Sequence, residues 1–372
     1  MILMPLGPNL IRVFGINAAE FGYLVASYGL SAGLSGFIFS FYADRFDRKK
    51  LLLIAYTGFL ICTFFCALSD SYGSLMIARV FTGIFGGVIG SLVLSIVADV
   101  FQYERRATAM GVIMTAFSVA AVAGVPGGLY LATKFDWEAP FFFVAGVGVF
   151  VLSGIYYIVP SVAAHLDTDQ PREKPIKILT NIINNSKQMW ALLLSTVIMM
   201  GHFSIIPYIS PSLVYNAGYR ESDIYLIYLC GGAFTIFTSQ LVGRLADRYG
   251  KYNIFKVFAL FSLIPIFLIT HLSPQPLVYI LAVAVLFFIM ANGRVVPLQA
   301  MVSNVVEPHN RGGFMAINSS VQLMAQAIAT SIGGLIIIQQ PSGYLDHYDY
   351  VGYFAITMIV IGIFVGAKLG EK

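Results

Sequence analysis

Charged residues are scarce in this chain. Asp, Glu, Lys and Arg together make up 11% of its 372 residues, whereas hydrophobic residues make up 58%. A water-soluble domain carries charges at roughly a quarter of its positions, so this composition excludes an ordinary soluble enzyme or regulator. The mean hydropathy of +0.81 supports the same conclusion. We therefore expect the chain to lie in a lipid bilayer.

The alternating pattern of a membrane barrel is also missing. Barrel strands alternate apolar and polar residues over segments of about ten. The apolar runs here continue for about 18 to 25 residues, which is the length of a membrane-spanning helix. Helices and closed barrels are the structures that satisfy every backbone polar group within a bilayer. The sequence therefore predicts an all-α polytopic membrane protein.

Cysteines, basic clusters and enzyme motifs are few. Cys62, Cys66 and Cys230 all lie in apolar runs, and we expect them to be packing residues rather than a disulfide framework or a metal site. No basic cluster outside short loops has room for a nucleic acid. The chain has no H-E-x-x-H motif and no paired intramembrane aspartates, which argues against a membrane enzyme. No cofactor is expected.

Hydropathy and helix breakers predict eleven complete membrane-spanning helices. Residues 1–13 are apolar but only about half the length needed to cross, and they lack the basic start and cleavage site of a signal peptide. We expect them to be part of a first helix whose beginning is missing from this chain. The predicted spans are residues 20–43, 50–68, 73–98, 106–132, 139–160, 188–215, 223–245, 252–271, 276–303, 312–339 and 350–369.

An Ala-Asp-Arg-aromatic phrase occurs twice, at residues 43–46 and 246–249, each time between two long apolar runs. The two aspartates lie 247 − 44 = 203 positions apart. A repeat of this kind predicts two pseudo-symmetric bundles of six helices, the usual architecture of secondary transporters. We expect the first bundle at residues 1–160, a linker at 161–187 and the second bundle at 188–372.

The distribution of Lys and Arg predicts the orientation. If the two repeated phrases face the cytoplasm, most basic residues fall on that side, and Arg12, Lys134 and Arg220 fall on the other. We therefore expect a cytoplasmic linker and C-terminus in a cell (inner) membrane. The latter part of the linker places apolar residues at helical spacing beside lysines, so a helix on the membrane surface and a flexible tether both remain open.

At the two repeated phrases the chain resembles the major facilitator superfamily. The family carries G-x-x-x-D-R-x-G-R-K between its second and third helices. The first copy here has lost both glycines, and the second copy retains both. The matching residues are Ser40, Asp44, Arg45, Asp47, Arg48 and Lys49 in the first copy, and Gly243, Asp247, Arg248, Gly250 and Lys251 in the second.

The resemblance implies a conformational latch at these positions. In the family, the Asp–Arg pair and an acid that closes the fourth helix hold the cytoplasmic side shut. Asp44 and Arg48 lie one turn apart if the helix continues, and Asp99 stands where the acid is expected. In the second half Asn304 replaces the acid, so Asp247, Arg248 and Lys251 are expected to form the weaker latch. Ordinary topogenic charge is the alternative interpretation.

Two glycine-containing segments extend the resemblance. In residues 73–98, Arg79 precedes Gly83, Gly86, Gly87 and Gly90, whose spacing allows close helix packing. The resemblance implies a coupling or gating role for Arg79; an arginine that reaches outward to the membrane surface is the alternative.

The second segment is Gly124, Pro126, Gly127 and Gly128, and it resembles the antiporter motif of the drug:proton antiporter branch, although the proline comes one place late. It predicts a bendable and closely packed helix. Tight packing without exchange would select the same residues.

Residues 276–303 contain a charge, a glycine and a proline inside one apolar run. Asn292, Arg294 and Gln299 flank Gly293 and Pro297, and this pattern predicts a broken helix that faces a cavity. Arg294 is the strongest candidate for binding an anionic or hydroxylated solute. Alternatively, it stabilises the break through backbone carbonyls.

Further polar residues are expected in a midplane cavity between the bundles. Asn318, Gln322 and Gln326 recur every four residues and form one polar stripe, and Tyr208 lies in residues 188–215. His202 is the only histidine within a predicted span and is a candidate for proton coupling, although a packing role is the commoner one. No Asp or Glu lies deep in a predicted span; Asn17 and Glu20 instead predict a capping box for the second helix.

The leading functional hypothesis is a secondary transporter that resembles the drug-efflux and sugar-efflux members of the superfamily. It predicts alternating access, a small drug-like or sugar-like substrate, the proton as coupling ion, and a monomer in the lipid bilayer. An uptake permease or uniporter of the same fold is the first alternative. A solute receptor that does not transport, or a membrane enzyme, is the second.

Overall fold

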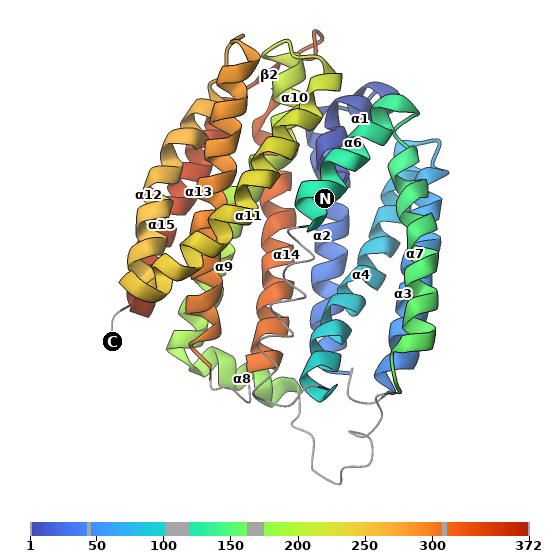
Figure 1. Ribbon diagram of the computed structural model, residues 1–372, viewed down its shortest axis with the longest axis vertical. Helices are drawn as coiled ribbons and strands as arrows, with labels where there is room; N and C mark the ends of the chain where they lie inside the picture. The colour runs from blue at the N-terminus through green and yellow to red at the C-terminus, as the bar shows by residue number, and fades with distance from the viewer. Residues whose placement is uncertain (1, 43–45, 101–118, 162–174, 307–310, 371–372) are drawn as a thin grey trace.

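Long helices form two halves that stand side by side (Figure 1). The structure is a computed structural model that describes residues 2–42, 46–100, 119–161, 175–306 and 311–370. Within these residues, ten helical stretches are long and apolar enough to cross a membrane. They agree with ten of the predicted spans. The remaining one, residues 106–132, begins outside the described residues.

The first half contains η1 and α1, a short helical pair, followed by the long helices. Its elements are η1 (Met4–Leu6), α1 (Gly7–Phe14), α2 (Ala18–Ser40), α3 (Arg48–Ala67), α4 (Tyr72–Val100), η3 (Ala120–Gly124), α6 (Val125–Lys134) and α7 (Ala139–Ile158). The predicted capping box starts α2: Glu20 N donates to Asn17 Oδ1 over 2.9 Å, and Asn17 N donates to Glu20 Oε2 over 2.8 Å. That prediction is confirmed.

The second half follows a short connecting helix, α8 (Pro175–Asn184). Its elements are α9 (Ser186–Phe203), α10 (Ile206–Tyr215), η5 (Glu221–Asp223), α11 (Ile224–Tyr249), α12 (Lys251–Thr270), α13 (Leu277–Ser303), α14 (Arg311–Ile336), β1 (Ile338–Gln339), β2 (Leu345–Asp346) and α15 (Tyr348–Gly370). The two strands form a small antiparallel hairpin. The latter part of the linker is helical at α8, and its predicted position on the membrane surface stays a prediction.

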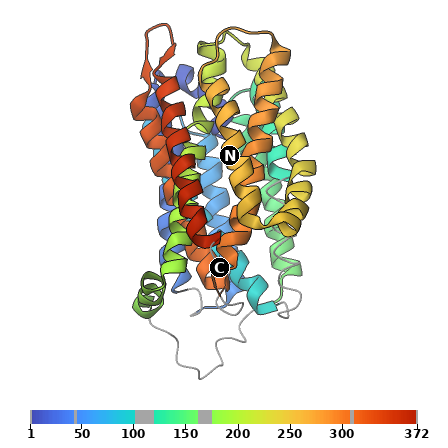
Figure 2. The ribbon, with the colours of Figure 1, turned by 90° about the vertical axis from the view of Figure 1, so that its left-hand side faces the viewer.

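The two ends of the bundle differ. The hairpin, α1 and α10 lie at one end, which we call the hairpin end (Figure 1). The connecting helix α8 lies at the opposite end, which we call the linker end, and a second view places it there as well (Figure 2). The phrase at residues 246–249 closes α11 at the linker end.

A seam of small residues joins the halves along α2 and α14. A Cβ atom added to Gly33 would lie 2.9 Å from the Ser320 carbonyl oxygen, and one added to Gly29 would lie 3.2 Å from the Leu323 carbonyl oxygen. The backbones therefore approach closely, because these positions carry no side chain. This seam was not predicted, although its signal is visible in the sequence as Gly22, Ala26, Gly29, Gly33 and Gly36.

Prolines produce two different outcomes in the second half. The predicted break in residues 276–303 is wrong: α13 is continuous over its 27 residues and contains Pro297. A single interior proline removes one backbone hydrogen bond, which this helix accommodates. The break occurs instead between α9 and α10, where Pro207 occupies the first turn of α10. Proline disfavours helical geometry in the residue before it and fits the start of a new helix.

Candidate functional site

The first predicted latch falls partly outside the described residues. Asp44 and Arg45 lie outside the described residues, and so does the side chain of Asp99. Arg48 is the first residue of α3 and is buried, with 5% of its surface exposed. Because α2 ends at Ser40 and α3 begins at Arg48, the condition that one helix continues through both Asp44 and Arg48 is not met. Asp47 caps α3, since Lys49 N donates to its Oδ1 over 2.9 Å.

The second phrase lies on a helix rather than in a loop. The predicted span ended at residue 245, but α11 extends to Tyr249, so Asp247 and Arg248 occupy its last turn. Gly250 has a φ of +91°, a backbone region that favours glycine, and Lys251 starts α12 directly after it. The guanidinium of Arg248 lies 5.2 Å from the centre of the Tyr249 ring. The latch role of these residues stays a prediction.

Arg79 is held inside the first half by an aromatic ring. Its guanidinium carbon lies 4.6 Å from the centre of the Tyr28 ring, on α2, which is within the range of a cation–π contact. The predicted glycine packing is confirmed at three positions of α4. A Cβ at Gly83, Gly86 or Gly87 would clash with atoms of α2. At Gly90 the same Cβ would meet no atom of the described residues within 4 Å, so packing at this position stays a prediction.

The antiporter-like segment contains an irregular helical turn, and its glycines make no close contact with the described residues. Residues Ala120–Gly124 form a π-helical turn, and Pro126 lies in the first turn of α6. A π-helical turn interrupts regular α-helix, as expected for a bendable segment. Among the described residues, a Cβ at Gly127 would meet nothing within 4 Å, and one at Gly124 or Gly128 would meet only ordinary contacts, so the predicted close packing stays a prediction.

Arg294 is the centre of a buried polar cluster in the second half. Its side chain is fully buried and reaches from α13 toward two neighbouring helices. Nη1 donates to Ser262 Oγ on α12 over 2.7 Å, and Nη2 lies 3.1 Å from His202 Nδ1 on α9. The Nε atom has no hydrogen-bond partner among the described residues. Arg294 therefore binds side chains of its own half, and the alternative that it binds the carbonyls of a broken helix is wrong.

The contact between Arg294 and His202 defines the protonation of the imidazole. A guanidinium carries only donors, so His202 Nδ1 must be the acceptor and its proton must reside on Nε2. The imidazole ring also stacks on Phe287 of α13, with centroids 6.0 Å apart and planes 11° apart. Ser262 was not predicted as part of this cluster, because a serine in an apolar helix gives no distinctive signal.

The predicted amide stripe of α14 faces its own half. Gln322 Oε1 accepts from Gln299 Nε2 of α13 over 3.4 Å, and Gln326 Nε2 donates to Met199 Sδ of α9 over 3.8 Å. Asn318 is buried, and within the described residues neither of its amide atoms has a partner. The same holds for Gln322 Nε2. The stripe thus presents donors and acceptors that are not committed to the protein.

Two other predicted cavity residues have different surroundings. Asn292 Nδ2 donates to Ser239 Oγ over 2.6 Å, so this side chain ties α13 to α11. Tyr208 is fully buried where α10 meets α2 and α14, and its hydroxyl donates to the Thr330 carbonyl oxygen over 2.7 Å. A Cβ at Gly22 or Gly334 would clash with that hydroxyl, so both glycines make room for it. Tyr208 therefore belongs to the contact between the halves.

The break between α9 and α10 is closed by side chains from two other helices. Thr330 Oγ1 of α14 donates to the Phe203 carbonyl oxygen over 3.1 Å, and Tyr348 Oη of α15 donates to the Ile205 carbonyl oxygen over 3.3 Å. The Phe203 carbonyl lies four residues before Pro207, which has no N–H, so Thr330 supplies the donor that the helix lacks. The Ile205 carbonyl also accepts from Tyr208 N over 3.0 Å. His202 lies one residue before the end of α9, directly beside this break.

One nucleophile-like spacing carries no catalytic geometry. Gly29, Ser31 and Gly33 match G-x-S-x-G, but they lie inside α2, where Ser31 Oγ donates to the Ser27 carbonyl oxygen over 2.7 Å. The hydrolase motif needs a strained turn between a strand and a helix. In the described part of the chain, no group of three His, Cys, Asp or Glu residues is placed to hold a metal ion.

Comparisons with known proteins place this arrangement in a family. The family described as Major Facilitator Superfamily matches residues 1–298. Multidrug resistance protein 2 of Bacillus subtilis (strain 168) is 21% identical over 378 residues, which cover 100% of this chain and 91% of that protein. A probable sugar efflux transporter of Helicobacter acinonychis (strain Sheeba) is 21% identical over 65% of this chain and 61% of its own length.

Solved structures agree with the fold. A bacterial homologue of the human lysosomal transporter Spinster, in an inward-facing and occupied conformation, superposes with a TM-score of 0.77 and 16% identity. The match covers 99% of this chain and 92% of that one. Helical architecture, sequence match and relatives all point to a transporter rather than an enzyme. The chain belongs to the major facilitator superfamily.

Proposed function

We propose that this transporter exports a small drug-like or sugar-like solute in exchange for protons, by exposing a site between its halves alternately to the two sides of the membrane. Relatives named for multidrug resistance and sugar efflux support export. The observation that carries the proposal is the contact between His202 and Arg294 beside the break in the second half. It joins a titratable group to a fixed positive charge.

Proton coupling follows from the chemistry of this contact. His202 accepts from Arg294 through Nδ1, so a proton that binds this nitrogen removes the acceptor. Two positive charges would then lie side by side in a buried environment, where repulsion is weakly screened. The two side chains must separate. Because Arg294 also bonds to Ser262 on α12, protonation of His202 acts on the packing of α9 against α12 and α13.

The uncommitted amides support a neutral hydroxylated or polar substrate. Both amide atoms of Asn318 and the Nε2 atom of Gln322, all on α14, have no partner among the described residues. A buried amide that lacks a partner costs about 1–3 kcal/mol. A solute that bonds to these groups recovers that free energy. Arg79 is proposed to gate from the first half, because its half-buried guanidinium is held by a ring on the seam helix α2.

The orientation is proposed from charge. The start of α9, residues 247–251 and the C-terminal end of α15 carry basic residues and lie at or toward the linker end. The positive-inside rule places such an end in the cytoplasm. We therefore propose a monomer in the cell (inner) membrane, with lipid around it and the hairpin end outside. Labelling of exposed Lys256 and Pro274, each as a cysteine variant, from one side of intact cells tests this orientation.

Transport in proteoliposomes tests the function. Neutral sugars and lipophilic drugs are added one at a time to the outside of inside-out vesicles. Uptake of each solute into the vesicles is followed with and without a pH gradient. Wild type is expected to concentrate one class only when the gradient is present. His202→Ala is expected to lose the dependence on the gradient, and Gln322→Leu to lose affinity for solute.

Matched variants keep the result specific. His271→Ala changes an exposed histidine at the hairpin end, and Gln240→Leu changes an exposed glutamine of α11. Both are expected to transport like wild type. Gradient-dependent transport that survives His202→Ala would refute the coupling role. Movement of solute down its gradient without any effect of pH would favour a uniporter instead.

A further inference from the structure

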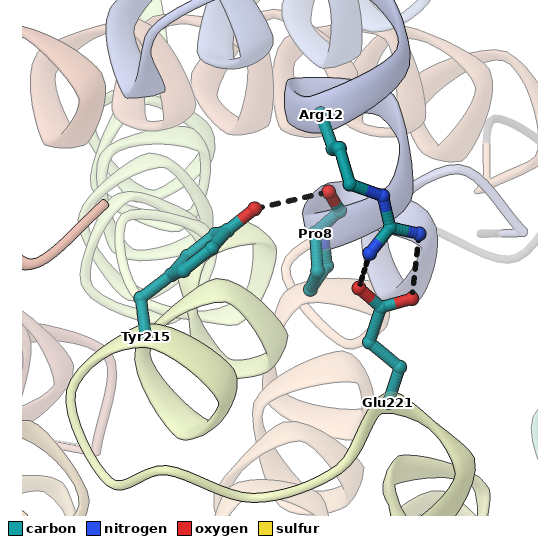
Figure 3. Close-up of polar contacts among 4 residues, drawn as sticks. All are labelled: Pro8, Arg12, Tyr215 and Glu221. Atoms are coloured by element: carbon teal, nitrogen blue, oxygen red, sulfur yellow. Dashed lines mark hydrogen bonds and ion pairs between the residues drawn. The ribbon is translucent and has the colours of Figure 1, made fainter. Parts of the chain in front are cut away.

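Two polar contacts bridge the halves at the hairpin end (Figure 3). Arg12 Nη1 lies 2.6 Å from Glu221 Oε1, and Nη2 lies 3.2 Å from Oε2, so the guanidinium binds the carboxylate with two parallel bonds. The Tyr215 hydroxyl donates to the Pro8 carbonyl oxygen over 3.2 Å. Arg12 and Pro8 belong to α1, and their partners belong to the second half.

Local structure positions Arg12. It lies in the last turn of α1, where a positive charge is favourable near the helix C-terminus. Gly15 follows with a φ of +61° and ends the helix, so α1 cannot extend past this point. The side chain of Arg12 points toward Glu221 of the opposite half, as Figure 3 shows.

The partner side is anchored to the second half by several bonds. Asn216 Nδ2 donates to the Leu345 carbonyl oxygen over 3.0 Å, and Leu345 N donates to Asn216 Oδ1 over 2.8 Å, so α10 and the hairpin are joined. The Tyr219 hydroxyl donates to the Gln275 carbonyl oxygen, which fixes the loop before Glu221 to the loop between α12 and α13. Glu221 therefore moves with the second half as a whole.

The exposure of the pair suits a contact that forms and breaks. The side chain of Arg12 is 63% exposed and that of Glu221 is 24% exposed. Water can hydrate both charges when they separate, whereas a fully buried pair would leave costly unpaired charges. The pair is thus strong enough to bias an equilibrium and weak enough to release.

We propose that Arg12, Glu221, Tyr215 and Pro8 form a latch that holds the hairpin end closed, and that this latch must open each time the site is exposed at that end. The inference rests on the proposed alternating access. It differs from the family-like phrases at the linker end, because it joins opposite halves at the other end of the bundle. Loss of the ion pair is expected to raise the population open at the hairpin end by about two- to fivefold.

Distances between spin labels test the latch. Cys62, Cys66 and Cys230 are first replaced by alanine, and labels are placed at Gly73→Cys and Pro274→Cys, two exposed positions of opposite halves at the hairpin end. A Cβ at Gly73 meets nothing within 4 Å, so the label does not disturb packing. Arg12→Glu and Glu221→Arg are each expected to increase the long-distance population. The double variant Arg12→Glu with Glu221→Arg is expected to restore the wild-type distribution.

A neighbouring ion pair provides the control. Arg220 Nε lies 3.2 Å from Asp223 Oδ2 within the second half, so Asp223→Ala removes a similar pair that does not bridge the halves. It is expected to leave the distances unchanged. A second label pair at Lys50→Cys and Arg244→Cys reports the linker end. The linker-end labels could show two distance populations while the hairpin-end distances do not respond to Arg12→Glu or Glu221→Arg. That result would overturn the proposed latch but not alternating access. One fixed distance at both ends in wild type would overturn alternating access itself.

Discussion

The bond between His202 and Arg294 makes a prediction that a double-mutant cycle can measure. His202→Ala leaves a buried guanidinium with Ser262 as its one remaining hydrogen-bond partner among the described residues. A hydrogen bond to a charged group contributes about 1.5–3 kcal/mol. We therefore expect this variant to be less stable than wild type by about 2 kcal/mol, beyond the loss of the ring stacked on Phe287.

Arg294→Met is expected to behave differently. The substitution removes a buried charge whose Nε has no partner among the described residues, and replacing buried charge by apolar volume is often neutral or stabilising by about 1–4 kcal/mol. It leaves His202 Nδ1 without a donor, which costs about 1–3 kcal/mol. Ser262 Oγ keeps its bond to the Ala259 carbonyl oxygen at 2.7 Å. The two effects nearly cancel, so the stability of Arg294→Met should lie close to that of wild type while transport is lost.

The cycle isolates the bond. In the Arg294→Met background, His202→Ala should cost about 1.5 kcal/mol less than in wild type, because the charged donor is gone. For a chain of 372 residues this coupling corresponds to about 2 °C in the thermal midpoint. Thermal unfolding in one detergent, followed by tryptophan fluorescence and by size-exclusion profile, measures it. Equal costs of His202→Ala in the two backgrounds would refute the bond.

Three further predictions concern packing. Gly87→Ala should lower the thermal midpoint measured in detergent, because its Cβ clashes with the Ala32 carbonyl oxygen. Gly90→Ala is the control and should not lower it, because its Cβ meets no atom of the described residues within 4 Å. Equal midpoints would contradict the packing of α2 on α4. Tyr208→Phe should destabilise by about 1 kcal/mol through loss of its bond to Thr330, and Tyr279→Phe, an exposed tyrosine, is the control in the same unfolding assay. Gly33→Val should slow transport more than Gly154→Val, because only the first lies on the seam with α14; equal transport rates would argue against a seam that works during the cycle.

Much of the fold was predictable because membranes impose long apolar helices. The spans, the capping box of α2 and the glycine packing of α4 followed from local patterns. The effect of each proline on its helix did not follow from local patterns. Pro297 lies within a continuous helix, whereas Pro207 lies in the first turn of a new one. At the break, partners far along the chain contribute, since Thr330 donates to the Phe203 carbonyl oxygen and Tyr348 adds a bond to the Ile205 carbonyl oxygen. A single sequence does not reveal such partners.

The candidate site was predictable in its residues but not in its contacts. Arg294, His202 and the amide stripe were all singled out, yet their mutual orientation depends on how α9, α12, α13 and α14 rotate against one another. The latch at the hairpin end was missed altogether. Arg12 and Glu221 lie 209 positions apart, and each alone is an ordinary charge near a helix end. Only the packing of the two halves brings them together.

The break between α9 and α10 lies where a movement at the hairpin end would pass to the rest of the second half. The Phe203 carbonyl accepts from Thr330 of α14 and the Ile205 carbonyl accepts from Tyr348 of α15. Two other helices therefore hold the joint between α9 and α10. A displacement of α10 through Tyr215 would therefore reach α14 and α15 through these two bonds. His202 lies one residue before the end of α9, directly beside this joint, so a change in its contact with Arg294 would act close to the bonds that tie α10 to α14 and α15.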